Sequence, residues 1–151
     1  MKGEVPVVEK MKISREQIIA FMEHEVRFNR MLGIHLVSLE NGLAIMELPF
    51  QEDLVGDPFR PALHGGVIST LVDTCGGAAV WSACEPEDRV STVDLRVDFL
   101  RPGPLETLRC EATVQRMGNR VGVTDMKVMA VSSPADLIAT GRGVYNVRRA
   151  E

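Results

Sequence analysis

The chain has 151 residues, which is enough for one domain with a substantial core and too few for a second domain to be expected. Hydrophobic residues make up 45% of it and charged residues 25%, a composition typical of ordinary globular proteins that argues against disorder outside the ends. The formal net charge of -4, with scattered basic residues, argues against a nucleic-acid binder, which needs a basic face to displace counterions from phosphates.

Residues 1–13 are assigned to an N-terminal tail, whose order the sequence leaves open. They have neither the apolar core of a signal peptide nor the Arg-rich, acid-poor character of a transit peptide, so a cytoplasmic protein is expected. Ser14 followed by Gln17 is then typical of a capping box, and apolar residues recur at spacings of three and four. This pattern predicts an amphipathic helix from residue 14 to about residue 32, ended by Gly33.

Two strands are predicted next, because apolar-rich residues 34–40 and 43–50 flank Asn41-Gly42. That dipeptide tolerates the positive φ angles of a two-residue hairpin turn. A polar loop with three prolines then leads to an apolar stretch, for which we predict a long helix starting near His64. Since this helix is apolar nearly all round, the rest of the fold must cover it on nearly all sides.

Strands are predicted again after the helix. Residues 91–100 alternate strictly, which places Val93 with Leu95 on one face and Thr92 with Asp94 on the other. Further strands are predicted over residues 105–116, 120–131 and 137–147. The short turns between them make neighbouring strands antiparallel.

The predicted fold class is therefore α+β, with one domain over residues 14–151. A strongly curved antiparallel sheet wraps the long central helix, and the N-terminal amphipathic helix precedes both. This is the arrangement that covers an apolar helix within a single domain of this size.

The start of the predicted long helix combines a histidine with two glycines. The first amides of a helix have no partner within it and carry the positive end of its dipole, so an oxyanion is well placed there. Gly65 and Gly66 lack side chains and let a ligand's carbonyl approach these amides closely. His64 either orients a ligand or caps the helix start, and its position alone favours the cap.

A single carboxylate, Asp73, stands in the middle of this stretch. At 3.6 residues per turn it shares a face with mostly small residues: Gly66, Ser69, Thr70, Gly76, Gly77 and Val80. A buried carboxylate must shift its pKa, gain hydrogen bonds or open to water and substrate, and each of these also prepares an acid for catalysis. The competing interpretation is a solvated Asp73, or one capped by the hydroxyl of Thr70 or Thr74, and the pattern alone does not choose.

The cysteines and histidines give no sign of a catalytic thiol or a metal site. Cys75, Cys84 and Cys110 are odd in number and form no Cys-x-x-Cys pair, which fits reduced thiols. The three histidines lie far apart, so no metal is expected. Asp73 and the glycines beside it favour a buried helix over a membrane span.

Together these residues resemble a known family. Leu63-His64-Gly65-Gly66, the segment Thr70 to Thr74, and the strand from Ser91 into Phe99-Leu100-Arg101-Pro102 are similar to motifs of the hotdog-fold acyl-CoA thioesterases, in their phenylacetate-pathway branch. The likeness runs from about residue 33 to the end. It implies a helix inside a curved sheet, a homodimer joined edge to edge with two shared active sites, and pairing of dimers into a homotetramer.

The resemblance also implies roles. The substrate is an acyl-CoA, and no cofactor is expected because coenzyme A is part of that substrate. The catalytic acid falls on Asp73, the amide that binds the thioester oxygen on Gly65, and the hydroxyl that helps hold the attacking water on Thr92. Further substrate-binding candidates are His64, Gly66 and Thr70 beside the acid, with Arg101, Arg120 and Arg142 for the phosphates of coenzyme A.

Two features depart from the family pattern. Relatives carry Asn or Gln six residues before the motif histidine, where this chain has Pro58. Asp57 takes that place if the loop holds a one-residue insertion, but a carboxylate donates a hydrogen bond only when protonated. In addition, strict alternation turns Thr92 away from the helix, which strand twist would have to reconcile.

The predicted function is hydrolysis of a small or medium acyl-CoA, including aryl-CoA, to the free acid and coenzyme A. Asp73 acts as general base or as nucleophile, and the acyl tail enters an apolar pocket that includes Val80 and Trp81. The alternative is a non-catalytic acyl-CoA or acyl-carrier binding protein, which Pro58 favours. A dehydratase or hydratase is disfavoured, because no histidine lies on the acid's helix face.

Overall fold

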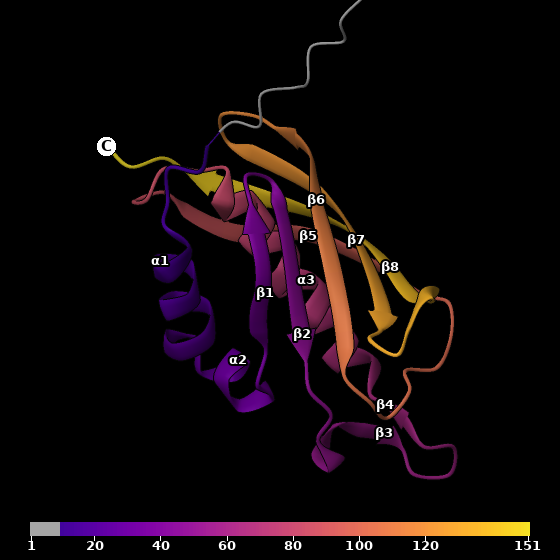
Figure 1. Cartoon of the computed structure of the whole chain (residues 1–151). Coiled ribbons are helices and arrows are strands. Elements are labelled where there is room, and N and C mark those ends of the chain that lie inside the picture. The colour runs from indigo at the N-terminus through magenta and orange to yellow at the C-terminus, as the bar shows by residue number, and fades with distance from the viewer. Residues whose placement is uncertain (1–9) are drawn as a thin grey trace, which may run out of the picture.

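A six-stranded antiparallel sheet curves around one long helix, α3 (Gly65–Ser82), in the computed structural model, which describes residues 10–151 (Figure 1). The strand order is β1-β2-β6-β7-β8-β5. The strands are β1 (His35–Glu40), β2 (Leu43–Leu48), β5 (Arg89–Phe99), β6 (Leu108–Met117), β7 (Val121–Ala130) and β8 (Ser133–Arg148). The predicted α+β class, with a central helix wrapped by an antiparallel sheet, is confirmed.

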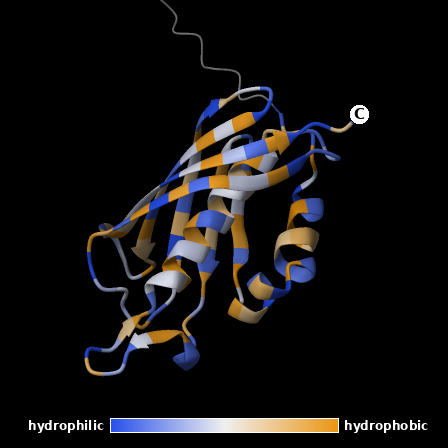
Figure 2. Ribbon diagram, turned by 180° about the vertical axis from the view of Figure 1, so that it is seen from behind, coloured by the Kyte–Doolittle hydropathy of each residue, from blue (hydrophilic) through white to orange (hydrophobic). Residues whose placement is uncertain are grey.

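Short elements surround this core. A 3-10 turn (Glu52–Leu54) leads into the small hairpin of β3 (Val55–Asp57) and β4 (Ala62–Leu63), which precedes α3. The N-terminal helices are α1 (Arg15–Ile19), a π-helical segment (Ala20–Glu25) and α2 (Arg27–Leu32). They lie beside β1 and α3, while hydrophobic and polar residues alternate along the strands (Figure 2).

Helix α3 is buried over most of its surface, as its apolar sequence predicts. Leu71, Val72 and Cys75 have no exposed surface. Glycines let the sheet approach: a Cβ on Gly76 would lie 2.3 Å from the hydroxyl of Tyr145 on β8. Within residues 10–151, no helix combines the length and the apolar character that a bilayer span requires.

The N-terminal helix begins and ends as the sequence predicts. The Oγ of Ser14 accepts a hydrogen bond from the amide of Gln17 at 3.1 Å, and Gly33 ends α2 with a φ of 72°. Of the predicted tail, residues 1–9 lie outside the described part of the chain. Ile13, which is 2% exposed, belongs to the hydrophobic core.

The prediction of one continuous helix up to residue 32 is wrong. The amide of Val26 bonds to the carbonyl of Phe21 rather than of Met22, and Val26 itself is extended (φ −75°, ψ 100°). The Nδ2 of Asn29, a residue that is 4% exposed, donates to the free carbonyl of Met22 at 2.9 Å. This side chain replaces a helical hydrogen bond and stabilises the break.

The predicted hairpin at Asn41-Gly42 is present, with Glu40 paired to Leu43. Of the two turn residues only Gly42 takes a positive φ, of 76°, and no residue other than glycine has a positive φ within residues 10–151. The turn therefore needs one left-handed residue and not two.

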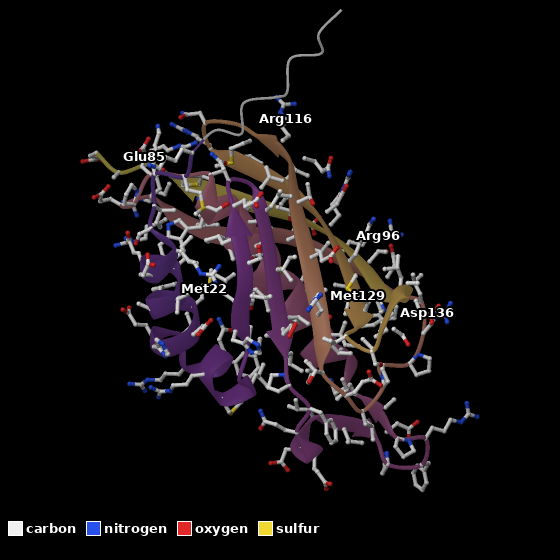
Figure 3. All side chains as sticks on the ribbon, viewed as in Figure 1. Met22, Glu85, Arg96, Arg116, Met129 and Asp136 are labelled. Carbon is white, nitrogen blue, oxygen red and sulfur yellow. The ribbon has the colours of Figure 1, made fainter. Side chains whose placement is uncertain are left out.

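The C-terminus is attached to the loop after α3 by a buried carboxylate. Asp88 is 2% exposed and accepts hydrogen bonds from Arg149 Nη1 at 2.9 Å, from the Ala150 amide at 3.0 Å and from the Glu85 amide at 2.9 Å. Outer-face charges such as Arg96 and Asp136 lie instead at the edge of the molecule (Figure 3).

Candidate active site

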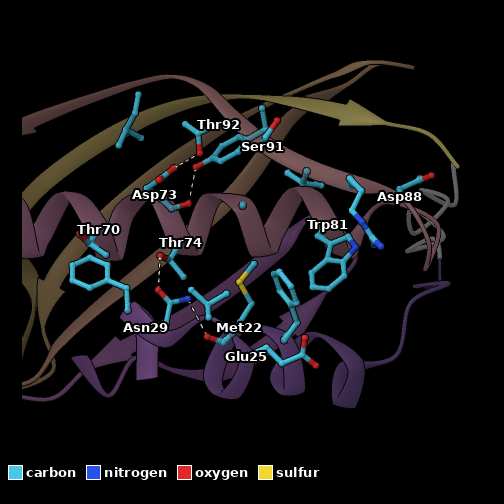
Figure 4. A pocket seen from close by; sticks show the side chains of 18 of the residues that line it. Met22, Glu25, Asn29, Thr70, Asp73, Thr74, Trp81, Asp88, Ser91 and Thr92 are labelled. Atoms are coloured by element: carbon cyan, nitrogen blue, oxygen red, sulfur yellow. Dashed lines mark hydrogen bonds between the residues drawn. The ribbon is translucent and has the colours of Figure 1, made fainter. Parts of the chain in front are cut away.

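A cleft of about 860 Å³ separates α3 from the N-terminal helices, with the first half of β5 along one side (Figure 4). Helix α3 contributes Ser69, Thr70, Asp73, Thr74, Gly77 and Trp81 to its lining. The predicted face of Asp73 therefore lines the cleft in part. Gly66, Gly76 and Val80 are exceptions. Gly66 lies at the start of α3, and the other two are turned toward the sheet, where Val80 packs against Gly122.

Asp73 is half-buried and hydrogen-bonded inside this cleft. Thr92 Oγ1 donates to Asp73 Oδ1 at 2.6 Å, and the hydroxyl of Tyr145 donates to the backbone carbonyl of Asp73 at 2.9 Å. A hydroxyl carries a single hydrogen, so Thr92 is left only with acceptor capacity. The second carboxylate oxygen, Oδ2, stays available for water or substrate.

The position of Thr92 corrects the prediction of strict alternation along its strand. In the β5–β8 pairing Thr92 lies opposite Tyr145 and Asp94 opposite Val144, so that Val93 is the extra residue of a β-bulge. The bulge turns Thr92 to the same side as Tyr145, toward α3, and leaves Val93 65% exposed. A local bulge, rather than strand twist alone, therefore brings Thr92 to the acid.

Tyr145 is a site residue that the sequence reasoning missed. Burial and the negative charge of Asp73 raise the pKa of its phenol well above the usual value, so the phenol stays protonated and donates. Its only sequence signal is that it is the single tyrosine of the chain and lies in an alternating strand. That signal does not identify a partner.

The hydroxyls of Thr70 and Thr74 do not cap Asp73, as the competing interpretation of the sequence would require. Thr70 Oγ1 donates to the carbonyl of Gly66 at 2.8 Å, and Thr74 Oγ1 donates to Asn29 Oδ1 at 3.4 Å. Both side chains still line the cleft. Asn29, on α2, also lines the cleft and was missed like Tyr145. The spacing of apolar residues predicted only that its helix packs against the core.

His64 caps the start of α3, as its position in the sequence favours. Its Nδ1 accepts a hydrogen bond from the Gly66 amide at 2.8 Å, so this amide is already engaged. The Gly65 amide has no acceptor among residues 10–151. Gly65 also lines a second hollow, of about 340 Å³, together with Phe99 and Arg101.

Asp73 and Gly65 of one chain are far apart. They are separated by eight positions of one helix, which at about 1.5 Å per residue amounts to roughly 12 Å. One thioester group is too small to contact both. The predicted acid and oxyanion donor therefore do not meet within a single copy of the chain.

The other predicted binding residues are dispersed. Asp57 Oδ1 accepts from the amides of Phe59 and Arg60 at 2.9 and 3.1 Å and thereby shapes the β3–β4 turn. Arg142 pairs with Asp125 at 3.0 Å. Asp57, Arg120 and Arg142 line neither hollow, so of the three arginines only Arg101 lies near Gly65.

The far end of the cleft is aromatic. Trp81 is 7% exposed and meets the ring of Phe21 edge to face, with centroids 5.2 Å apart and planes at 75°. Its indole Nε1 is buried without an acceptor among residues 10–151. Of the two residues predicted for the acyl pocket, Trp81 lines the cleft and Val80 does not.

Comparisons with known proteins agree with this architecture. Residues 61–133 match the thioesterase superfamily model. A Halobacterium salinarum protein provisionally named an esterase is 35% identical over 125 residues, 78% of this chain and 82% of that protein. The medium/long-chain acyl-CoA thioesterase YigI of Escherichia coli is 30% identical over 141 residues, 85% of this chain and 88% of that protein.

A solved structure extends the comparison to the fold. The Escherichia coli PaaI protein from the phenylacetic acid degradation operon matches with a TM-score of 0.75, over 89% of this chain and 95% of that one. Its sequence identity of 24% is low, so it shows a shared fold and no more. The phenylacetate-pathway branch stays a prediction.

Proposed function

The chain belongs to the hotdog thioesterase superfamily, and on that premise we propose that it is an acyl-CoA thioesterase. The observation that carries the proposal is the half-buried carboxylate of Asp73, held by Thr92 and facing a cleft that is largely apolar. Such a cleft accepts an acyl chain, and the carboxylate lies where that chain's carbonyl would enter. The relative YigI, whose name states acyl-CoA thioesterase, supports the same substrate class.

The chemistry proposed for Asp73 has two routes. As general base, the carboxylate takes a proton from a water that adds to the thioester carbonyl, and the C–S bond then breaks to release coenzyme A as a thiolate, which is reprotonated. As nucleophile, Asp73 itself adds to the carbonyl and the C–S bond breaks, so that coenzyme A leaves as a thiolate. Water then hydrolyses the mixed anhydride to the free acid and restores the Asp73 carboxylate. In both routes Thr92 fixes the carboxylate through Oδ1 and leaves Oδ2 to react.

The oxyanion is proposed to be stabilised by the Gly65 amide of a second copy of the chain. The roughly 12 Å along α3 excludes the amide of the same copy, and backbone donors of this kind contribute about 3 kcal/mol to lowering a barrier. Strand β5 is the free edge at one end of the sheet, and it exposes Val93 and Phe99 by 65% and 52%. Pairing of two such edges would form a homodimer and bury these side chains. The homotetramer remains a prediction.

Arg101 is the proposed cation for the phosphates of coenzyme A. It lines the hollow that contains Gly65, and its side chain is 60% exposed, with a loose 3.9 Å contact to Asp136. We propose no cofactor, because the base and the oxyanion donor both come from the protein and coenzyme A is part of the substrate. The alternative is that Arg101 is an ordinary surface arginine with no role in binding. Arg101→Ala tests this, because a raised KM for acyl-CoA with unchanged kcat supports phosphate binding.

The test of the proposal is release of free thiol from a panel of acyl-CoAs. Wild type should release coenzyme A, Asp73→Asn should abolish release while it retains binding, and Asp73→Ala should behave alike. Wild type that binds the esters without releasing thiol would establish the alternative, a non-catalytic acyl-CoA or acyl-carrier binding protein. Full rates in both variants would show that Asp73 is not the reacting group.

A further inference from the structure

The cleft has a defined length along α3. Figure 4 shows Asp73 and Thr92 on the upper side of α3, Thr74 and Met22 on its lower side, and Trp81 and Asp88 toward the right-hand end. Asp73 and Trp81 are eight positions apart on one straight helix, which corresponds to roughly 12 Å. An acyl chain whose carbonyl lies at Asp73 therefore has about this distance to run before it meets the indole.

The walls of this channel suit an unbranched aliphatic chain. Phe21 and Met22 come from the π-helical segment, Leu95 from β5, and Gly77 on α3 adds no side chain between Asp73 and Trp81. A polymethylene chain would contact these apolar side chains and the backbone at Gly77.

The far end of the cleft is narrowed by contacts between distant segments. Phe21 packs against Trp81, and Gln17 Nε2 donates to the carbonyl of Pro86 at 3.3 Å. These contacts attach the N-terminal helices to the loop that follows α3. Phe21 and Trp81 therefore narrow this end of the cleft, beyond which Gln17 and Asp88 still belong to its lining.

We propose that this cleft selects straight acyl chains of about eight to ten carbons and that Phe21 and Trp81 set the upper limit. The inference rests on the proposed thioesterase function and deepens it. With C–C bonds of about 1.5 Å, an extended chain advances roughly 1.3 Å per carbon, so roughly 12 Å holds about nine carbons. A phenylacetyl group fills only about half of that length.

The expected rate profile follows from apolar burial. Each further methylene that enters the cleft should raise kcat/KM about fourfold up to the limit, because burying it removes apolar surface from water. Beyond about ten carbons the tail meets the Phe21–Trp81 wall, and kcat/KM should fall. Phenylacetyl-CoA should be at least tenfold worse than octanoyl-CoA.

The experiment measures thiol release for straight-chain acyl-CoAs from butyryl to palmitoyl and for phenylacetyl-CoA. Phe21→Ala, at a position 43% exposed, should move the optimum at least two carbons longer. Trp81→Leu should act in the same direction. Phe59→Ala is the matched control, because Phe59 is 93% exposed and lines neither hollow, and its profile should equal that of wild type.

Two failures are distinguishable. Absence of thiol release from every ester overturns the proposed function. Binding of the same esters to Asp73→Asn still measures the preference for chain length, because it does not require hydrolysis. A flat profile in binding and rate, an optimum at phenylacetyl-CoA, or a Phe21→Ala profile unchanged from wild type overturns the chain-length inference even where hydrolysis is present.

Discussion

The hydrogen bond from Thr92 to Asp73 is the contact most open to a direct test. Thr92→Val keeps the shape of the side chain and removes the hydroxyl that lies 2.6 Å from Oδ1. A hydrogen bond to a charged group contributes about 1.5–3 kcal/mol. Thr92 is exposed along the strand edge, so water replaces part of that stabilisation and the lower end applies.

About 1.4 kcal/mol corresponds to a tenfold change in rate, so kcat of Thr92→Val should fall about tenfold. KM should stay within twofold, because the hydroxyl orients the acid and does not bind the acyl chain. The assay is thiol release under saturating acyl-CoA, with thermal unfolding measured in parallel. Thr92→Ser is the matched control, since it restores the donor and should recover most of the rate. A kcat of Thr92→Val equal to that of wild type would refute the role of this bond.

Three further outcomes are expected. Arg149→Ala should lower the free energy of unfolding by about 2 kcal/mol in urea titrations, because it leaves the buried Asp88 carboxylate without its cation. Burial opposes ionisation of Asp88, but its hydrogen bonds and Arg149 hold its pKa below the usual range of an aspartate. The stability that Asp88 provides is therefore present at neutral pH and is lost as the pH falls through that lowered pKa. Acid unfolding of Arg149→Ala that matches wild type would contradict this. The three cysteines are buried, and burial raises the pKa of Cys84 to about 11. A thiol reagent at pH 8 should therefore label the native protein slowly and label three thiols after denaturation. Rapid labelling of the native protein would contradict this. Val93→Lys should shift the sedimenting species from the proposed dimer to a monomer and lower activity per chain, and an active monomer would argue against a shared site.

Local signals in the sequence determined much of the fold. The N-cap at Ser14, the helix stop at Gly33, the hairpin turn at Gly42 and the cap at His64 each depend on a few adjacent residues, and all four are present. The alternation of the later strands and the apolar length of α3 predicted the layers for the same reason. A backbone angle or a two-residue period needs no information from distant parts of the chain.

Only the tertiary structure decided how the candidate site is assembled. Thr92 faces Asp73 because pairing of β5 with β8 creates a bulge at Val93, which the alternation of β5 alone concealed. The N-terminal helix breaks because Asn29 reaches the carbonyl of Met22, and its segments then form one wall of the cleft. The bulge depends on pairing with the distant strand β8, and the cleft wall depends on contacts such as that of Asn29 with Thr74, 45 positions away. Such contacts exist only once the chain has folded.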